Sequence, residues 1–260
     1  MNELININYD SERPTVLGRD LHKLLEVKTP YTQWFDRMCE YGFTENIDFI
    51  SFSQNSEKPQ GGRPTQDHQL TIDMAKEICM LQRTERGKQA RQYFIQIEKD
   101  WNSPEKVLER ARMIEDQKRL AIRNELKTHN KALADAAHDA GVTQPIDYAI
   151  FQNKGYQGLY GGMTRKDIHA HKGLKKNQDI LDHMGSTELA ANLFRATQTE
   201  EKLRRENIQG KERANQTHYD VGLKVRKTMQ EISGTMPEDL PTPEKSIKQI
   251  EKEQKKLPKK

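Results

Sequence analysis

The sequence of 260 residues has only two cysteines and no long apolar run. Cys39 and Cys79 are too few and too far apart for a disulfide framework or a zinc knuckle, so both are expected to be small buried hydrophobic residues. The longest strongly apolar run, Ile78 to Leu81, is far too short to span a bilayer, and the first residues lack a basic segment followed by an apolar one. We therefore expect a cytoplasmic protein that does not bind membranes.

Motifs that would indicate an enzyme or a cofactor are also missing. A glycine-rich stretch contains Gly155, Gly158, Gly161 and Gly162. No Gly-Lys-Ser/Thr sequence comes after it to hold a phosphate at the start of a helix, so these glycines are expected to form tight turns around Tyr156 and Tyr160. Asp179 and His183 supply two metal ligands at helical spacing, which is too few for a site. We expect a protein that is not an enzyme and that binds neither cofactor nor metal.

Hydrophobic residues are scarce, and the charge is unevenly distributed. Hydrophobic residues make up 33% of the chain and charged residues 32%, which indicates solvated helices, linkers or tails beside the compact parts. Residues 1–101 contain 13 Lys and Arg against 16 Asp and Glu, a net charge of −3, whereas the remainder contains 30 against 23, a net charge of +7. If the chain contacts nucleic acid, the second half is the better candidate.

The first hundred residues predict an α+β domain of the winged-helix type. The alternating segment 4–9 predicts a strand, and apolar spacing predicts helices near 16–25 and 30–39. Two further alternating segments on either side of a polar loop, near 46–52 and 68–72, predict a long-tipped hairpin. Two more helices come next, up to Trp101.

This segment resembles a known family. The stretches LHKLLEVKTPYTQWFDRM, ENIDFI and GGRPTQDHQLTIDMAKEICMLQRTERGKQARQYFIQIEK occur in the order found in the AntA/AntB phage antirepressor domain, over roughly residues 14–100. The resemblance implies a protein that switches off a phage repressor by binding it. We expect the repressor contacts to be Trp34, Arg37, Tyr41, Arg63 and Arg91. For the aromatic residues among them, the alternative is a purely structural role in the core.

The next segment has no glycine or proline between Pro104 and Gly141. It predicts one helix of 36 residues, which would be about 54 Å long. A helix of this length with a narrow apolar stripe needs a partner helix, so we expect it to support a homo-oligomer, either a dimer or a tetramer. The expected contact residues are Ile122, Leu126, Leu133 and Ala137. The alternatives are a helix laid along another domain of the chain and a single solvated spacer.

Residues 173–207 predict two helices joined at Gly185, with Ser186 capping the second, and residues 215–232 predict a third. Basic residues lie along the polar sides of this hairpin. Those that could face nucleic acid are Lys172, Lys175, Lys176, Arg204 and Arg205. They could contact a phosphate backbone, or they could form ion pairs with the nearby Asp179, Glu188, Glu200 and Glu201. The sequence leaves both explanations open.

The stretch DYAIFQNKGYQGLYGGMTRKDIHAHKGLKKNQDILDHMGSTELAANLFRATQTEEKLRREN, together with its flanking residues from about Arg119 to the C-terminus, closely resembles the C-terminal domain of the DNA-damage-inducible protein D (DinD) family. The resemblance implies a link to the SOS response and a partner that is RecA, its DNA or both. The last residues, rich in proline and lysine, predict an extended basic arm that ends in a short helix docked through Ile247 and Ile250. A crossing of this arm to a neighbouring subunit is a further hypothesis.

Together these patterns predict a mainly α protein with a small β component. We expect an antirepressor-like domain (1–102), a connector helix (103–140), a helical DinD-like domain (141–236) and a C-terminal arm (237–260). The leading hypothesis is a phage or prophage antirepressor, in a bacterial host cell, that binds a phage repressor, relieves its operator binding and promotes lytic induction in an SOS-linked response. The alternatives are a modulator of RecA filaments or single-stranded DNA binding, and a winged-helix-like domain that binds its own promoter.

Overall fold

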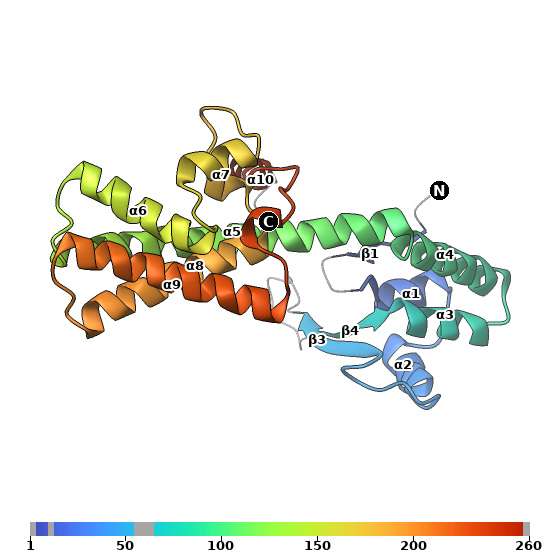
Figure 1. The fold of residues 1–260 in the computed structure, drawn as a ribbon. Helices are drawn as coiled ribbons and strands as arrows, with labels where there is room; N and C mark the ends of the chain where they lie inside the picture. Colours follow the sequence, from blue (N-terminus) through green and yellow to red (C-terminus); the bar gives the residue numbers. More distant parts are fainter. Residues whose placement is uncertain (1–3, 10–12, 55–64, 257–260) are drawn as a thin grey trace. The chain divides into compact units, whose positions relative to one another are not determined.

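The computed structural model describes residues 4–9, 13–54 and 65–256 (Figure 1). It confirms a mainly helical protein with a small sheet. The chain forms two compact units, residues 1–109 and 110–260, and each has its own hydrophobic core. Within the described ranges, no helix is both long and apolar enough to cross a membrane.

The described part of the first unit combines a small antiparallel sheet with helices α1 to α4 and the first turns of α5. Its elements are β1 (Ile7–Asn8), β2 (Thr15–Leu17), α1 (Gly18–Leu24), α2 (Tyr31–Cys39), β3 (Phe49–Gln54), β4 (Thr65–Thr71), α3 (Ile72–Leu81) and α4 (Glu85–Trp101). The strand order is β1-β2-β4-β3, so β3 lies at the edge of the sheet among the described strands. The hydroxyl groups of Thr71 and Thr84 cap α3 and α4 by accepting hydrogen bonds from Met74 N and Gly87 N.

An aromatic cluster between α2 and the sheet forms the core of the first unit. The ring of Phe35 stacks on His68 of β4 with centroids 3.6 Å apart, and the Tyr31 hydroxyl bonds to His68 Nδ1 at 2.7 Å. Trp34 is 1% exposed in the same cluster. Because these rings pack against one another, α2 is held to the sheet largely by its aromatic residues.

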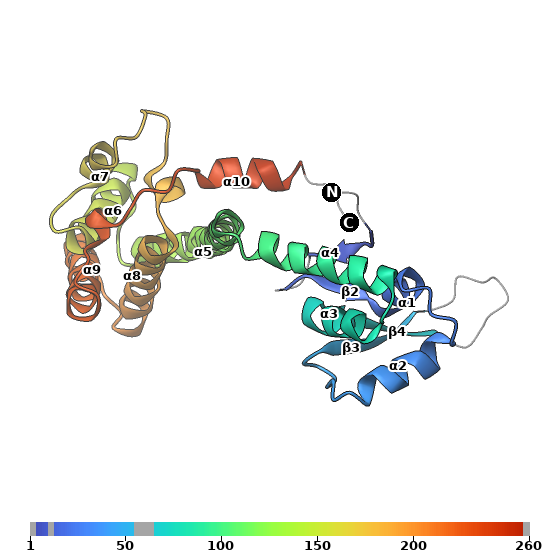
Figure 2. The same ribbon diagram turned by 90° about the vertical axis from the view of Figure 1, so that its right-hand side faces the viewer.

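The second unit is a bundle of helices. Its elements are α5 (Pro104–Asp139, whose first turns belong to the first unit), α6 (Pro145–Leu159), α7 (Arg165–His171), the 3₁₀ turn η1 (Ile180–His183), α8 (Ser186–Arg205), α9 (Lys211–Ile232), the 3₁₀ turn η2 (Pro237–Asp239) and α10 (Ile247–Gln254). In Figure 2, α8 and α9 are seen nearly end-on. Their apolar residues share one core with α5 and α6.

The long helix α5 packs inside its own unit. Leu126, Leu133 and Ala137 are 0% exposed in the core formed with the other helices, and Ile122 packs against that core. The structure therefore matches the alternative of a helix laid along its own chain. Leu126, Leu133 and Ala137 are covered by the unit itself, which does not fit the oligomer contact expected for them, whereas Ile122 is only partly buried.

The segment before α8 differs from the predicted helix. Gly173 takes a positive φ of 63° after α7, and the chain then turns through a loop into η1 without forming a regular helix. Gly185 occupies the N-cap position of α8. Ser186 is not the cap, because its backbone N–H and its hydroxyl donate to the carboxylate of Glu115 on α5 at 2.8 and 2.7 Å.

Two of the four clustered glycines lie inside α6, not in turns. A Cβ added at Gly158 would collide with the Tyr219 carbonyl of α9, and a Cβ added at Gly222 of α9 would lie 2.7 Å from the Gly155 carbonyl of α6. These glycines therefore allow the two helix backbones to approach closely. Only Gly161 and Gly162, with φ of 59° and 97°, form the turn that ends the helix.

The C-terminal arm docks on its own unit. The hydroxyl and backbone of Ser246 form a capping box with Gln249 at the start of α10, and Ile247 and Ile250 are buried as predicted. The Arg119 guanidinium also donates to the Lys245 carbonyl at 2.9 Å. The arm therefore has partners within the unit, which does not fit an arm that crosses to a neighbour.

The contact between α6 and α9 gives a first prediction. Gly158→Ala should destabilise the protein by about 2 kcal/mol or more, because the new methyl group forces the two backbones apart. Gly185→Ala is the matched control, since a Cβ there would meet only Glu115 Oε1, at 3.7 Å, and should cost less than about 1 kcal/mol. Urea unfolding followed by circular dichroism measures both. Equal losses in the two variants would contradict the close-approach argument.

Candidate functional site

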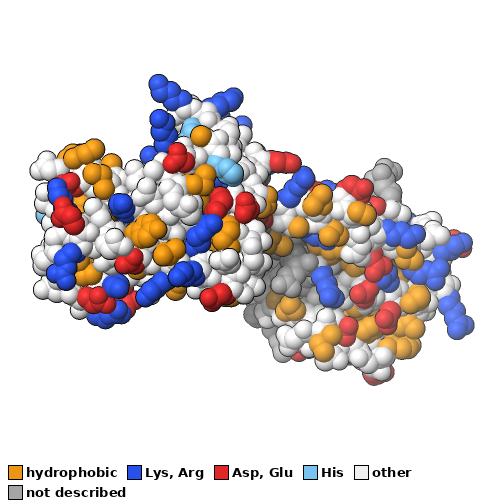
Figure 3. All heavy atoms as spheres, in the orientation of Figure 1, with side chains coloured by type: hydrophobic (Ala, Val, Ile, Leu, Met, Phe, Trp, Pro, Cys, Tyr) orange, Lys and Arg blue, Asp and Glu red, His pale blue; other side chains and the backbone are white. Residues whose placement is uncertain are grey.

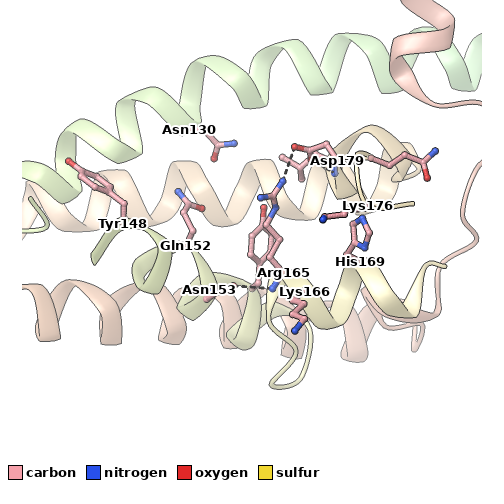
Figure 4. Close-up of a pocket in the computed structure, with 13 residues that line it drawn as sticks. Asn130, Tyr148, Gln152, Asn153, Arg165, Lys166, His169, Lys176 and Asp179 are labelled. Carbon is pink, nitrogen blue, oxygen red and sulfur yellow. Dashed lines mark hydrogen bonds and ion pairs between the residues drawn. The ribbon is translucent and has the colours of Figure 1, made fainter. Parts of the chain in front are cut away.

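A pocket of about 760 Å³ opens in the second unit between α5, α6, α7 and the segment that follows α7 (Figure 4). This volume lies within the usual range for ligand sites. The lining residues are Asn130, Tyr148, Ala149, Gln152, Asn153, Tyr156, Arg165, Lys166, His169, Lys176, Gln178, Asp179 and Leu181. The lining therefore combines carboxamides, tyrosines and basic side chains.

The pocket has two chemically different ends. Figure 4 shows Tyr148, Gln152 and Asn130 toward one end, and the basic residues Arg165, Lys166, His169 and Lys176 together at the other. The first group comes from α5 and α6, and the second from α7 and the segment after it. A ligand along this pocket would meet amide and phenol groups first and positive charge next.

Hydrogen bonds fix the basic end in place. The backbone N–H of Arg165 donates to Asn153 Oδ1 at 3.0 Å, and its guanidinium pairs with Asp179 at 3.0 Å. The Lys175 N–H donates to Gln178 Oε1 at 2.7 Å. Thr164 and Asp167 form a capping box at the start of α7, and the hydrogen bonds from Thr164 lower the pKa of the Asp167 carboxyl.

The basic end carries unneutralised charge. Asp179 is the only carboxylate among the lining residues, and it is already paired with Arg165. Within the described part of the chain, neither Lys166 nor Lys176 has a carboxylate within 4.0 Å. The side-chain oxygen of Asn130 is buried and has no hydrogen-bond partner in the same described part. The pocket thus offers positive charge and amide donors.

Behind the pocket lies a network of buried polar side chains. The guanidinium of Arg195 lies 4.9 Å from the ring centroid of Tyr156, which lines the pocket, and hydrogen bonds link Arg195 to His218 and Asn192. Nδ1 of His218 donates to the Phe151 carbonyl at 2.9 Å, so its Nε2 accepts from Arg195. Burial, together with the charge of Arg195, holds the pKa of His218 well below its ordinary value.

The network continues to α7 through an ion pair. Glu188 accepts hydrogen bonds from the Tyr160 hydroxyl at 2.9 Å and from Lys172 at 2.8 Å. Both side chains of the pair are almost fully buried, and burial raises the pKa of Glu188 while Lys172 opposes that rise. A buried pair of this kind is costly to break, because the remaining charge would have no partner.

The five basic residues expected to face nucleic acid or RecA differ in burial and in ion pairing. Lys172 is buried in its pair with Glu188, whereas Lys175 and Lys176 are exposed. The other two form ion pairs along α8, Arg204 with Glu200 at 3.3 Å and Arg205 with Glu201 at 3.1 Å. Only Lys176 of the five lines the pocket.

The other pocket residues were not predicted. Tyr148, Gln152 and Tyr156 follow one another at intervals of four, as do Ala149 and Asn153 one position along, so they share one side of α6. This spacing was the available signal. It was missed because the glycines of α6 were assigned to turns. Arg165 and Lys166 gave no signal beyond their charge.

The residues expected to bind a repressor also differ in their exposure to solvent. Trp34 is buried in the core and cannot contact a partner, whereas Arg37 is exposed and Tyr41 is 63% exposed. Arg91 is half-buried, and Arg63 lies outside the described residues. The structure adds Ile47 and Ile50, which are 72% and 58% exposed. The alternation in the sequence NIDFISF could have indicated Ile50, because it points away from the buried Phe49.

No group of three or more His, Cys, Asp or Glu side chains in the described part of the chain is arranged to hold a metal ion. In particular, Asp179 is paired with Arg165, and His183 is buried in η1. Burial lowers the pKa of His183.

Comparisons with known proteins match both units. Residues 113–250 match the family described as DinD C-terminal domain, and residues 16–84 match the AntA/AntB antirepressor family. Over 137 residues, the chain is 70% identical to DNA damage-inducible protein D of Escherichia coli (strain K12). The aligned part is 53% of this chain and 50% of that protein, so the chain spans about half the length of the curated relative that it matches.

The buried histidine gives a second prediction. Below the ordinary histidine pKa of 6.5, the unfolded chain takes up a proton at His218 that the folded chain does not. The free energy of unfolding should therefore fall as the pH drops below this value, by up to about 1.4 kcal/mol per pH unit for this group. His68 and His183 act in the same direction, because burial lowers their pKa values too.

Urea unfolding between neutral and mildly acidic pH measures this slope. His218→Gln should make it shallower, whereas His138→Gln, at a side chain that is 62% exposed, serves as the matched control. The interpretation would fail if the wild-type slope were unchanged in His218→Gln.

Proposed function

We propose that this chain, which belongs to the DinD C-terminal domain family, is a phage or prophage antirepressor that binds a repressor and relieves its operator binding. In this proposal, repressor capture promotes lytic induction as part of an SOS-linked response. The observation that carries it is the presence of an AntA/AntB antirepressor domain and a DinD C-terminal domain in one chain. The first family motivates the repressor as target, and the second motivates the link to DNA damage.

The α2–β3 segment, residues 37–50, supports a protein partner. It exposes Arg37, Tyr41, Ile47 and Ile50 within a short stretch of the first unit. Exposed tyrosine, arginine and aliphatic side chains are typical of the residues that contribute most to protein interfaces. The turn from Thr44 to Phe49 is held by hydrogen bonds, including Thr44 N to Asp48 Oδ2 at 2.8 Å, so Ile47 is presented on an ordered backbone.

Binding alone is sufficient for this activity. A repressor cannot bind the antirepressor and the operator at the same time in this proposal. The free energy of capture therefore determines what fraction of the repressor stays on DNA. To change operator occupancy from about 99% to about 1%, capture must be favoured by on the order of 5.5 kcal/mol. An interface of ordinary size supplies this without any covalent step.

A second candidate function comes from the second unit. Its 70% identity to DNA damage-inducible protein D favours a modulator of RecA filaments or of single-stranded DNA binding. The match covers half of that relative, so this candidate concerns only what the shared part does. It predicts that the full chain changes RecA-coated single-stranded DNA in the absence of any repressor, whereas the leading proposal does not require this.

A third prediction tests repressor capture. Ile47→Asp should raise the concentration of protein needed to release a cognate repressor from operator DNA by about tenfold or more, because the charge disrupts an apolar contact. Ile146→Asp, at an isoleucine of the second unit that is 67% exposed, is the matched control and should act like the wild type. Gel mobility of the operator complex measures release. If the wild type releases none of the repressors of its prophage, the proposal fails.

A further inference from the structure

The pocket of the second unit is a localised positive site. Lys166 and Lys176 reach it from α7 and from the segment after it, and within the described chain neither has a carboxylate within 4.0 Å. Several other basic side chains of this unit are paired, as in Arg204 with Glu200 and Arg226 with Glu238. On the face shown in Figure 3, acidic and basic side chains alternate over much of the second unit, while basic ones gather near α7 at the top.

The carboxamides of the pocket add hydrogen-bond donors. Asn153 and Gln178 each use the side-chain oxygen to accept a backbone N–H, which leaves their NH₂ groups as donors. A ligand that satisfies these donors has carbonyl or carboxylate oxygens. A polypeptide backbone provides a carbonyl oxygen at every residue.

A nucleic acid strand fits these observations less well. Its phosphates repeat along the chain and call for a row of unpaired cations. Three of the five basic residues expected to face nucleic acid are used otherwise, Lys172 in a buried ion pair and Arg204 and Arg205 in pairs along α8. Lys175 is exposed beside Lys176. The positive charge available at the pocket is therefore suited to one or two anionic groups.

We propose that this pocket binds an acidic, extended segment of a partner polypeptide. Carboxylates of the segment pair with Lys166 and Lys176, and its backbone carbonyl groups accept hydrogen bonds from Asn153 and Gln178. This function goes beyond repressor capture by the α2–β3 segment and does not depend on it, because all of the residues involved lie in the second unit. The chain then has two separate protein-binding sites.

The test measures binding of a fluorescein-labelled peptide of alternating glutamate and glycine to the full chain by fluorescence anisotropy. The wild type should bind this peptide and should bind the same peptide with glutamine in place of glutamate at least about tenfold more weakly. Lys166→Glu with Lys176→Glu should weaken glutamate-peptide binding by about tenfold or more. Lys224→Glu with Lys227→Glu makes the same charge change on exposed lysines of α9 and should stay within about twofold.

The thermal midpoint separates binding from folding. Neither Lys166 nor Lys176 has a carboxylate within 4.0 Å in the described chain, so Lys166→Glu with Lys176→Glu breaks no ion pair and its thermal midpoint should stay close to that of the α9 control. Ile47→Asp should bind the peptide like the wild type. Loss of repressor release with intact peptide binding would then concern only the first site.

Three outcomes would overturn the proposal. The first is equal binding of the glutamate and glutamine peptides. The second is an equal loss in the pocket variant and in the α9 control. The third is tighter binding of a single-stranded oligonucleotide than of the glutamate peptide, with the same dependence on Lys166 and Lys176, which would assign the pocket to nucleic acid.

Discussion

The close approach of α6 and α9 determines much of the second unit. Gly155, Gly158 and Gly222 lack side chains where the two backbones meet, and the space at Gly155 is filled by the facing groups of Arg195 and His218. A methyl group at Gly155 would collide with both. Because Arg195 is held there, its guanidinium lies over the ring of Tyr156, whose position forms part of the pocket. The pocket therefore depends on glycines that do not line it.

Polar side chains replace part of the hydrophobic core in this unit. Arg119 and Arg195 are among the largest fully buried side chains, and Lys172 with Glu188 and Arg123 with Asp182 form buried or nearly buried ion pairs. Each buried charge is compensated by hydrogen bonds or by an opposite charge, as low-dielectric surroundings require. This explains how a chain with only 33% hydrophobic residues fills the core of its second unit.

The sequence was informative where local signals were strong. Caps and apolar spacing predicted α4, α5, the second helix of the 173–207 hairpin and α9. The apolar pattern of the last helix predicted the docking of Ile247 and Ile250. The prediction of turns at Gly155 and Gly158 was wrong, because glycine can also allow two helices to pack closely, and these two do so. The pocket could not be predicted, because its basic residues come from a loop and a short helix whose approach to α5 is set by tertiary contacts. For Trp34 the sequence left a partner contact and a place in the core open, and its burial matches the core.

Arg119 joins three separate stretches of the second unit. Its guanidinium donates to the carbonyl groups of Met184, Asp182 and Lys245, so the C-terminal arm is bonded to the centre of α5. A relative that lost the arm would retain an arginine with fewer acceptors in a dry environment. The arm and this arginine should accordingly be gained and lost together in evolution.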